Sequence, residues 1–296
     1  MAKLPNISIL GCGKVGTALG MLAARAGATV VAVASRHRCQ AKKAAESIGG
    51  SVRVLDMREA AAAGGLVLLT VSDDAIAAVC AELAQARAFR QGALVAHCSG
   101  SLGSDVLAPA RACGCAVGSA HPLQTFPTVA AAVGRIQGAH FFIEGDDAAV
   151  TVLETLARAV GGRPSRINAE AKALYHAAAS MACNYLVALL EGAARLGDWA
   201  EIRGDAFLTA IDPLVLATVE NVNELGPAEA LTGPIARGDV DTLRRQIDAV
   251  KACGDAALLG AFTGMAGLTI DLAIRKGTID ITAAEAMRAL LRDVKE

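Results

Sequence analysis

The sequence predicts an α/β domain with a doubly wound parallel sheet, followed by an all-helical domain. Apolar runs typical of strands alternate with helix-forming runs through the first half, and the strand pattern vanishes from Asn168 onward. A chain of 296 residues is long enough for two domains. Paired glycines and a proline in 161–165 break both periodicities. We therefore expect domains at 1–163 and 164–296.

The expected elements of the first domain follow from its apolar runs. The run 66–71 is apolar throughout, as suits a strand buried on both faces of a sheet. Gly27 is a natural stop for the first helix, and Asp146 is placed to cap the last one. The strands are expected at 6–10, 28–34, 51–55, 66–71, 94–97, 115–119 and 139–144, with the last as the final strand, and the helices at 17–26, 40–48, 73–86, from about 104, and from 146 to about 160.

The second half reads as helices only. Asp212-Pro213 is expected to cap and begin one helix, and Thr282-Ala-Ala-Glu285 to form a capping box. The stretch 256–270 is the most apolar; it is too short to span a bilayer, so we expect a buried helix. Its small residues Gly260, Gly264 and Gly267 would allow close helix approach and predict a homodimer. The helices are expected at 168–197, 212–225, 240–252, 255–276 and 282–295.

Composition narrows the possible partners. The net charge of -1 provides no basic field for nucleic acid or a membrane surface, so neither partner is expected. Four of the eight cysteines, Cys12, Cys80, Cys98 and Cys183, lie in apolar segments and no signal peptide precedes the first strand. We interpret them as reduced, buried residues of a cytoplasmic protein. The Cys113-Gly-Cys115 spacing matches no metal motif, so no metal is expected.

A glycine-rich turn follows the first apolar run. In Gly11-Cys12-Gly13-Lys14-Val15-Gly16, the first glycine would allow a sharp turn, Gly13 would leave room for phosphates, and Gly16 would let helix and strand pack closely. A helix N-terminus would present free N–H groups to the anion. This context predicts dinucleotide binding, with a purely structural glycine turn as the alternative.

Residues at the end of the second expected strand indicate whether the site binds NAD or NADP. An NAD site would place Asp or Glu there to bind the ribose 2′-hydroxyl, and the sequence has none. Ser35, Arg36 and Arg38 stand there instead, and they suit a 2′-phosphate. We therefore expect NADP; the alternative is a pair of solvated surface arginines.

Polar residues follow three further strands, where ligands of such sheets lie. Val71 and Ser72 are expected to line the cofactor, and Asp73 either does so or caps a helix. Ser99 is expected near the nicotinamide, while His97 is interpreted as a core histidine. His121 ends its strand and could donate a proton to a carbonyl or imine.

A polar stripe runs along the first helix of the second half. Lys172, His176, Ser180 and Asn184 recur every four residues on an otherwise apolar helix. Burying Lys172 without a partner would be costly, so it must face solvent, a carboxylate or a ligand. The alternative is the exposed face of a surface helix.

These motifs together resemble a known family: bacterial two-domain Rossmann-like proteins whose C-terminal half is a domain of unknown function. They belong to the superfamily of 6-phosphogluconate and 3-hydroxyisobutyrate dehydrogenases, pyrroline-5-carboxylate reductase and prephenate dehydrogenase. The matching segments, which span nearly the whole chain, are 11–16, Ser99-Gly100, His121-Pro122, 172–176 with Asn184, and 231–239.

The resemblance implies an NADP-binding fold, a helical domain that commonly dimerises and a cleft between the domains. Lys172 and Asn184 resemble the substrate-binding Lys and Asn of the hydroxyacid dehydrogenases, although their spacing here is wider, and His176 stands at the fourth position after the lysine. His121-Pro122 resembles the His-Pro of prephenate dehydrogenases.

The expected function is an NADP(H)-dependent oxidoreductase that reduces a small carbonyl or imine at the interdomain cleft. His121, Lys172, His176 and Asn184 are the candidate catalytic residues. The alternative is a non-catalytic NADP(H) sensor or regulatory protein, because fold alone does not decide between turnover and binding.

Overall fold

The computed structural model describes residues 4–294 and divides the chain into two compact units. The first extends to Ala182 and the second begins at Cys183, within the long helix α8 (Lys172–Trp199). The division into compact units does not test the predicted boundary between residues 163 and 164, which stays a prediction.

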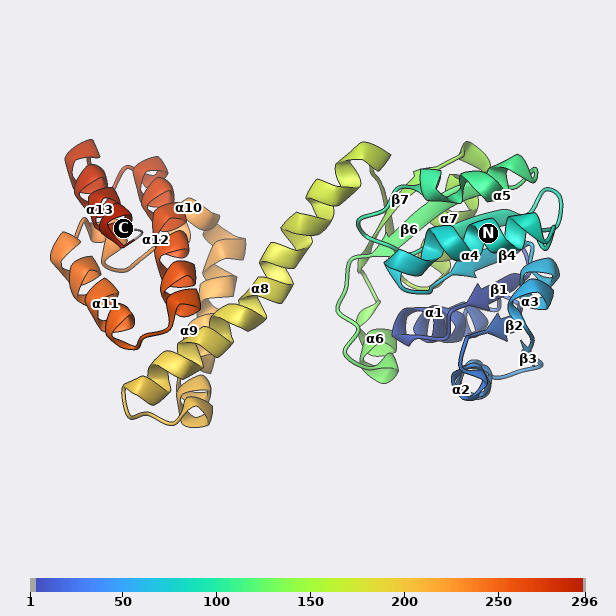
Figure 1. Ribbon diagram of the computed structural model, residues 1–296, viewed down its shortest axis with the longest axis horizontal. Coiled ribbons are helices and arrows are strands. Elements are labelled where there is room, and N and C mark those ends of the chain that lie inside the picture. Colours follow the sequence, from blue (N-terminus) through green and yellow to red (C-terminus); the bar gives the residue numbers. More distant parts are fainter. Residues whose placement is uncertain (1–3, 295–296) are drawn as a thin grey trace. The chain divides into compact units, whose positions relative to one another are not determined.

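One eight-stranded sheet forms the centre of the first unit (Figure 1). Its strand order is β3-β2-β1-β4-β5-β6-β7-β8, and all neighbours are parallel except β6 and β7. The order reverses between β1 and β4, which creates the switch point where such sheets bind ligands. The strands are β1 (Ile7–Leu10), β2 (Val30–Ala34), β3 (Arg53–Val54), β4 (Leu66–Leu69), β5 (Leu94–His97), β6 (Ala116–Pro122), β7 (His140–Gly145) and β8 (Arg163–Arg166).

The doubly wound sheet is confirmed, with two differences. β7 runs antiparallel to β6, and β8 is a strand that the sequence did not predict, so the run 139–144 is not the last strand. β8 consists of Arg163, Pro164, Ser165 and Arg166, and it pairs only with β7 at the sheet edge. A proline and polar side chains are tolerated at an edge, where one side of the strand needs no ladder partner.

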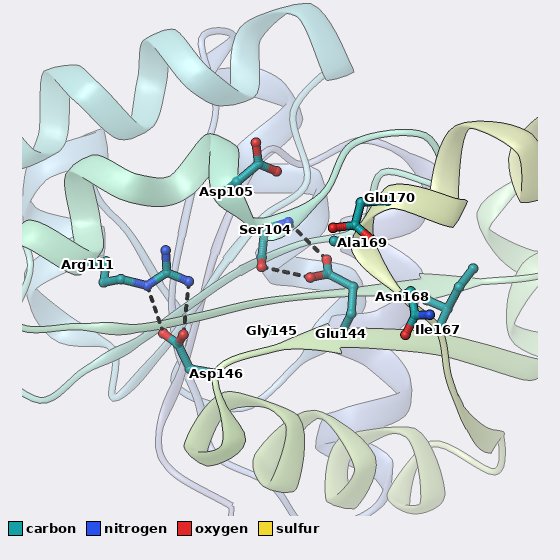
Figure 2. A pocket seen from close by; sticks show the side chains of 10 residues that line it. All are labelled: Ser104, Asp105, Arg111, Glu144, Gly145, Asp146, Ile167, Asn168, Ala169 and Glu170. Atoms are coloured by element: carbon teal, nitrogen blue, oxygen red, sulfur yellow. Dashed lines mark hydrogen bonds and ion pairs between the residues drawn. The ribbon is translucent and has the colours of Figure 1, made fainter.

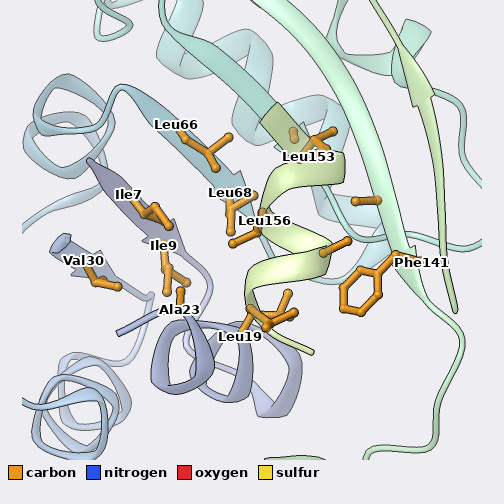
Figure 3. Packing of buried hydrophobic residues seen from close by; sticks show 14 of the residues in the cluster. Ile7, Ile9, Leu19, Ala23, Val30, Leu66, Leu68, Phe141, Leu153 and Leu156 are labelled. Carbon is orange, nitrogen blue, oxygen red and sulfur yellow. The ribbon is translucent and has the colours of Figure 1, made fainter. Parts of the chain in front are cut away.

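Helices cover both faces of the sheet because the strand side chains alternate. In β4, Leu66 and Leu68 join one apolar cluster (Figure 3). Val67 and Leu69 join the other. Full burial of each such leucine contributes roughly 1.5–3 kcal/mol. The first cluster lies under α1 (Lys14–Arg25), α2 (Arg38–Ile48), α6 (Val129–Arg135) and α7 (Asp147–Ala159), and the second under α3 (Met57–Ala63), α4 (Asp73–Gln85) and α5 (Ala108–Ala112).

Two of these helices, α3 and α6, were not predicted from the sequence, and the role expected for Asp146 was wrong. Asp146 stands at the N-cap position of α7, but its side chain makes no capping bond. Its carboxylate instead accepts the Val117 N–H at 2.8 Å and pairs with Arg111 at 2.9 Å. A charged partner and a strand amide therefore outcompete the helix amides for this carboxylate.

The second unit is all helical, as expected. Its core gathers Leu243, Ile270 and Met287 from three helices. Its elements are the second part of α8, α9 (Gly204–Leu225), α10 (Pro227–Ala230), the 3₁₀ turn η3 (Ile235–Arg237), α11 (Val240–Ala252), α12 (Ala256–Lys276) and α13 (Ile281–Asp293).

Two helix starts in this unit differ from the prediction. Pro213 lies inside α9, which begins at Gly204, so Asp212-Pro213 does not begin a helix. Asp280, not Thr282, caps α13 by accepting the Ala283 N–H at 2.8 Å. A carboxylate one residue before the helix satisfies this amide directly, which leaves the Thr282 hydroxyl without that role. Residue 295, the expected end of this helix, lies outside the described residues.

The helix α12 is less buried than the sequence predicted. Only Thr263, Ala266, Ile270 and Ala273 are buried, and they form one face three or four residues apart. The helix also extends to Lys276, and by length and composition both α12 and the segment 169–199 are long and apolar enough to cross a membrane. The expectation that this stretch is too short to span a bilayer was therefore wrong. Cys183 is likewise exposed on α8 rather than buried.

Candidate functional site

The glycine-rich turn joins β1 to α1 at the switch point of the sheet. Gly11 has φ +113°, and a Cβ there would collide with the backbone of Thr70. A Cβ at Gly16 would collide with the Gly11 carbonyl oxygen and the Thr70 hydroxyl. Gly13 differs, because a Cβ there would meet no atom within 4 Å. The turn is therefore closely packed at Gly11 and Gly16 and open at Gly13.

Thr70, at the end of β4, fixes this turn. Its hydroxyl donates to the Gly11 carbonyl at 2.6 Å, a long-range contact that the sequence analysis missed. α1 then begins at Lys14, three residues earlier than predicted, and its N-cap Gly13 provides no side-chain acceptor. The amides of the first helical turn are thus left for an external anion. Of the other residues expected to bind the cofactor here, Cys12 is buried against the Ala34 carbonyl, whereas Lys14 is exposed.

The end of β2 presents cationic side chains. Arg36 and Arg38 are exposed, and neither forms an ion pair within the described part of the chain. The Ser35 hydroxyl donates to Gln40 at 3.3 Å. α2 begins at Arg38 rather than Gln40, which places this arginine in its first turn. Together, Ser35, Arg36 and Arg38 offer the hydroxyl and the two cations that would bind a phosphate at this strand end.

Ser72 follows β4 and Ser99 follows β5, and the hydroxyls of these two residues differ in their hydrogen bonds. Ser72 is the exposed N-cap of α4 and makes no capping bond, whereas the Ser99 hydroxyl donates to Asp73 at 2.6 Å and accepts the amides of Ser101 and Leu102. Asp73 thus binds hydroxyl groups rather than capping α4. Ser72 remains free for a ligand, and Val71 beside it is half-buried; the hydroxyl of Ser99 is engaged within the protein.

His97 is a core histidine, as one interpretation of the sequence held. Its Nδ1 accepts the Ser99 N–H at 3.1 Å and its Nε2 lies 3.1 Å from the Gly103 carbonyl. This pattern fits a neutral ring with the proton on Nε2. Burial, reinforced by the positive charge of Lys172, lowers the pKa of His97 to about 4.

Lys172 begins α8 and has no solvent exposure. Its ammonium donates to the Ser99 carbonyl at 2.9 Å and to the Ser119 hydroxyl at 2.5 Å, and it lies 3.8 Å from Glu144. Burial lowers the pKa of Lys172, while Glu144 acts in the opposite direction. Of the three surroundings that the sequence allowed for Lys172, the structure contains the carboxylate.

Glu144 is itself almost fully buried, and three groups donate to it. They are the hydroxyl of Ser119 and both the N–H and the hydroxyl of Ser104, the last two at 2.9 and 2.8 Å. Figure 2 shows the Ser104 contacts at the edge of a pocket of about 800 Å³. The pocket is lined by Ser104, Asp105, Arg111, Glu144, Gly145, Asp146, Ile167, Asn168, Ala169 and Glu170.

A second cluster forms beyond the carboxyl ends of β5 and β6. His121 Nδ1 lies 2.8 Å from the Tyr175 hydroxyl, and the rings of His121 and His176 meet edge to face at 5.5 Å. Tyr175 and His176 share a face of α8 with Lys172 because they follow it by three and four residues. Phe142 packs against the Tyr175 ring at a centroid distance of 4.4 Å.

Gly100 closes one side of this cluster. A Cβ at Gly100 would collide with His176 Nδ1 and would lie 3.0 Å from His121 Cε1 and Nε2. The buried Nδ1 of His176 has no hydrogen-bond partner among the described residues. Burial, with the adjacent His176, lowers the pKa of His121 to about 4, and burial raises the pKa of Tyr175 to about 12. His121 is therefore neutral and Tyr175 protonated near neutral pH.

The structure brings together His121, Ser99 and the pair Lys172 and His176, which the sequence placed on three separate segments. Asn184 is exposed in the second unit, and its role stays a prediction. Sequence reasoning missed the parts played by Tyr175 and Glu144. The sequence did contain a signal for Glu144. This residue directly follows the apolar run 141–143 within the expected strand, and its carboxylate is the partner that a buried lysine needs.

Comparison with known families identifies both halves of the chain. Residues 2–122 match the model of the Rossmann-like domain, and residues 139–267 match the model described as Domain of unknown function (DUF2520). The chain is a Rossmann-like domain followed by a DUF2520 domain. No curated protein matches the chain in sequence. The family expected from the sequence is thereby confirmed.

Solved structures share the fold of this Rossmann-like and DUF2520 chain. A Bacteroides fragilis protein described as an NADP oxidoreductase has a TM-score of 0.74 at 23% identity, over 90% of this chain and 98% of that chain. A reductive aminase from Aspergillus terreus, in complex with NADPH and ethyl levulinate, has 0.63 at 19% identity, over 97% and 99%. A pyrroline-5-carboxylate reductase from Coxiella burnetii has 0.58 at 16% identity, over 99% and 98%. At these identities, the likeness is one of fold.

Proposed function

We propose that this protein is an NADP(H)-dependent oxidoreductase that reduces a small carbonyl or imine compound. One observation carries the cofactor assignment. A Cβ at Gly13 would meet nothing, the first amides of α1 have no side-chain cap, and Arg36 and Arg38 at the neighbouring strand end form no ion pair with any described residue. Amides suit the pyrophosphate, and the arginines suit a 2′-phosphate. The NADPH-bound reductive aminase of the same fold supports this choice.

The remaining cofactor contacts follow from the strand ends. Val71 and Ser72 would lie along the cofactor beyond β4, and the backbone of Ser99 and Gly100 would face the nicotinamide beyond β5. When bound, NADPH would supply a hydride to the substrate carbon. The protein side chains would orient the substrate and supply the proton. That the reaction takes place in a cleft between the domains stays a prediction.

The substrate class is supported by the cluster at the end of β6. His121 and Tyr175 place a hydrogen-bonded pair of proton-carrying groups beyond the sheet, where a carbonyl oxygen or imine nitrogen could be protonated. The structural neighbours include a reductive aminase and a pyrroline-5-carboxylate reductase, whose named chemistry is consistent with such a substrate.

The test is NADPH oxidation by the purified protein with a panel of cyclic imines, and of ketones and aldehydes with and without an added amine. We expect at least one class to be reduced. Tight NADPH binding with no oxidation across the panel would contradict the reductase proposal and support a non-catalytic NADP(H)-binding protein.

We also propose a homodimer formed through the helical unit. A groove of about 430 Å³ runs along α12 past Gly260, Gly264 and Gly267 to Leu291 and Val294. A Cβ at Gly260 or Gly264 would meet nothing within 4 Å, so a second helix could approach closely. Large apolar side chains of α8 and α9 are also exposed in the single chain, among them Tyr185, Val187, Leu214 and Val219. A second copy of the chain would cover such an area better than water does.

A further inference from the structure

The cluster at the carboxyl ends of β5 and β6 contains several groups that could carry a proton. Lys172 is the residue that the family resemblance favours, but its ammonium has no exposure and already donates to Ser99 and Ser119 beside Glu144. A group held in this way cannot reach a substrate without breaking a buried ion pair. The structure therefore indicates that Lys172 holds the segment after β5 in place.

The two histidines are half-buried, and one nitrogen of each ring is hydrogen-bonded or buried. The Nδ1 of His121 is hydrogen-bonded to Tyr175, and a Cβ added at Gly100 would lie 3.0 Å from its Nε2. His176 Nδ1 is buried beneath the same glycine. The Ser99 hydroxyl is engaged by Asp73 and by two amides.

Tyr175 is half-buried, unlike Lys172 and Ser99, and its hydroxyl has a single hydrogen-bond partner among the described residues. Its ring is held between Phe142 and His121. With the proton of His121 on Nδ1, that nitrogen donates to the phenolic oxygen, and the phenolic O–H is then directed away from the protein.

We propose that Tyr175 is the proton donor of the reaction and that His121 is the residue that positions it. The inference rests on the proposed function. As the substrate carbon receives a hydride, the O–H bond of Tyr175 breaks and a new O–H or N–H bond forms on the substrate heteroatom. The resulting phenolate accepts the Nδ1–H of His121, and it regains a proton from water once the product has left.

The central variant is Tyr175→Phe, which removes the hydroxyl and keeps the ring against Phe142. The matched control is Tyr185→Phe, the other tyrosine of the chain, which is exposed on the same helix. We expect Tyr175→Phe to lower kcat by roughly 10²- to 10⁴-fold, the usual contribution of a general acid. NADPH affinity should be unchanged, and the control should match the wild type in both measurements.

A second readout does not need turnover. In protein with ¹⁵N-labelled histidine, Tyr175→Phe should shift the Nδ1 resonance of one neutral ring, whereas Tyr185→Phe should shift none of the five histidines. If neither variant moves a resonance, the pair does not exist in solution and the inference is wrong.

The outcomes separate the two proposals. If the wild type reduces a substrate and Tyr175→Phe does so equally fast, Tyr175 is not the donor, although the reductase assignment stands. If the wild type binds NADPH but reduces nothing in the panel, the reductase assignment fails and the role of Tyr175 fails with it. Loss of kcat with intact NADPH binding and a shifted Nδ1 resonance supports both.

Discussion

The ammonium nitrogen of Lys172 lies 2.5 Å from the hydroxyl oxygen of Ser119, in a side chain that has no contact with solvent. Ser119 in turn donates to Glu144, so a lysine on α8 is joined to a carboxylate on β7 through a serine on β6. Side chains from α8, β6 and β7 are thereby joined at one place, where the ammonium also donates to the Ser99 carbonyl.

Replacing Lys172 by Met should destabilise the protein strongly. The change keeps most of the side-chain volume but leaves Glu144 buried without its cation, which typically costs about 3–5 kcal/mol. Urea denaturation would measure the loss in free energy of unfolding. Arg158→Ala breaks the exposed pair with Glu154 and should cost less than about 1 kcal/mol.

The double variant Lys172→Met, Glu144→Gln checks the reason for that loss. Because glutamine carries no charge, it should recover part of the stability lost in the single variant. A double variant no more stable than Lys172→Met would show that the buried charge is not the cause.

Acid should destabilise the protein through its buried histidines. The folded pKa of His97 and of His121 is about 4, below the ordinary value of 6.5, so the unfolded chain binds more protons than the folded chain between these values. Stability is therefore lost as the pH falls from about 6.5 to about 4. The loss reaches about 3 kcal/mol for each histidine at 1.36 kcal/mol per pKa unit.

The measurement is urea denaturation at several pH values between 7 and about 4 for the wild type and for His97→Asn. Carboxylates also titrate in this range, so the difference between the two proteins is the informative quantity. The variant should lose less stability on acidification. Parallel curves would mean that His97 is not held neutral by the fold.

Gly13 and Gly11 should respond differently to substitution by alanine. At Gly13 the added methyl group points into open space, so the free energy of unfolding should change by about 1 kcal/mol or less, while NADPH affinity should fall at least about tenfold. At Gly11 the methyl group meets the Thr70 backbone at a positive φ, so stability itself should fall.

Thermal unfolding and NADPH fluorescence titration separate these two effects. A Gly13→Ala protein that binds NADPH as tightly as the wild type would contradict the placement of the pyrophosphate at this turn. The cofactor would then have to lie elsewhere on the sheet edge.

The dimer proposal is tested by filling the groove on α12. Gly264→Leu places a large side chain where a second helix would approach, so it should convert a dimer into monomers in sedimentation at micromolar concentration. Ala252→Leu, on α11 outside the groove, is the control and should leave the dimer intact. A wild-type monomer under the same conditions would contradict the proposal.

The sequence predicted the sheet well because its strands are buried on both faces, as the run Leu66–Leu69 shows. It did not reveal β8, whose residues Arg163 and Arg166 are exposed at the edge and lack the apolar pattern. Pro213 was also misread, since a proline is compatible with either a first turn or a helix interior whose neighbours offset the lost hydrogen bond.

The candidate site was predictable only in part, because some of its contacts are local in the sequence and others are not. Gly11 and Gly16 belong to one local motif of six residues, whose geometry follows from backbone sterics. His121 and Tyr175 are 54 residues apart, and Lys172 and Ser99 are 73 apart. Such pairings depend on how α8 packs against the strand ends, which no local pattern encodes.

The most direct test of the account compares the affinities of the wild type for NADPH and NADH by fluorescence titration. We expect NADPH to bind more tightly, and Arg36→Ala to weaken NADPH by roughly 10- to 100-fold while leaving NADH unchanged, because a charge-assisted phosphate contact is worth about 1.5–3 kcal/mol. Arg58→Ala, at an exposed arginine of α3, is the control. Equal affinities, or a preference for NADH, would contradict the NADP(H) assignment.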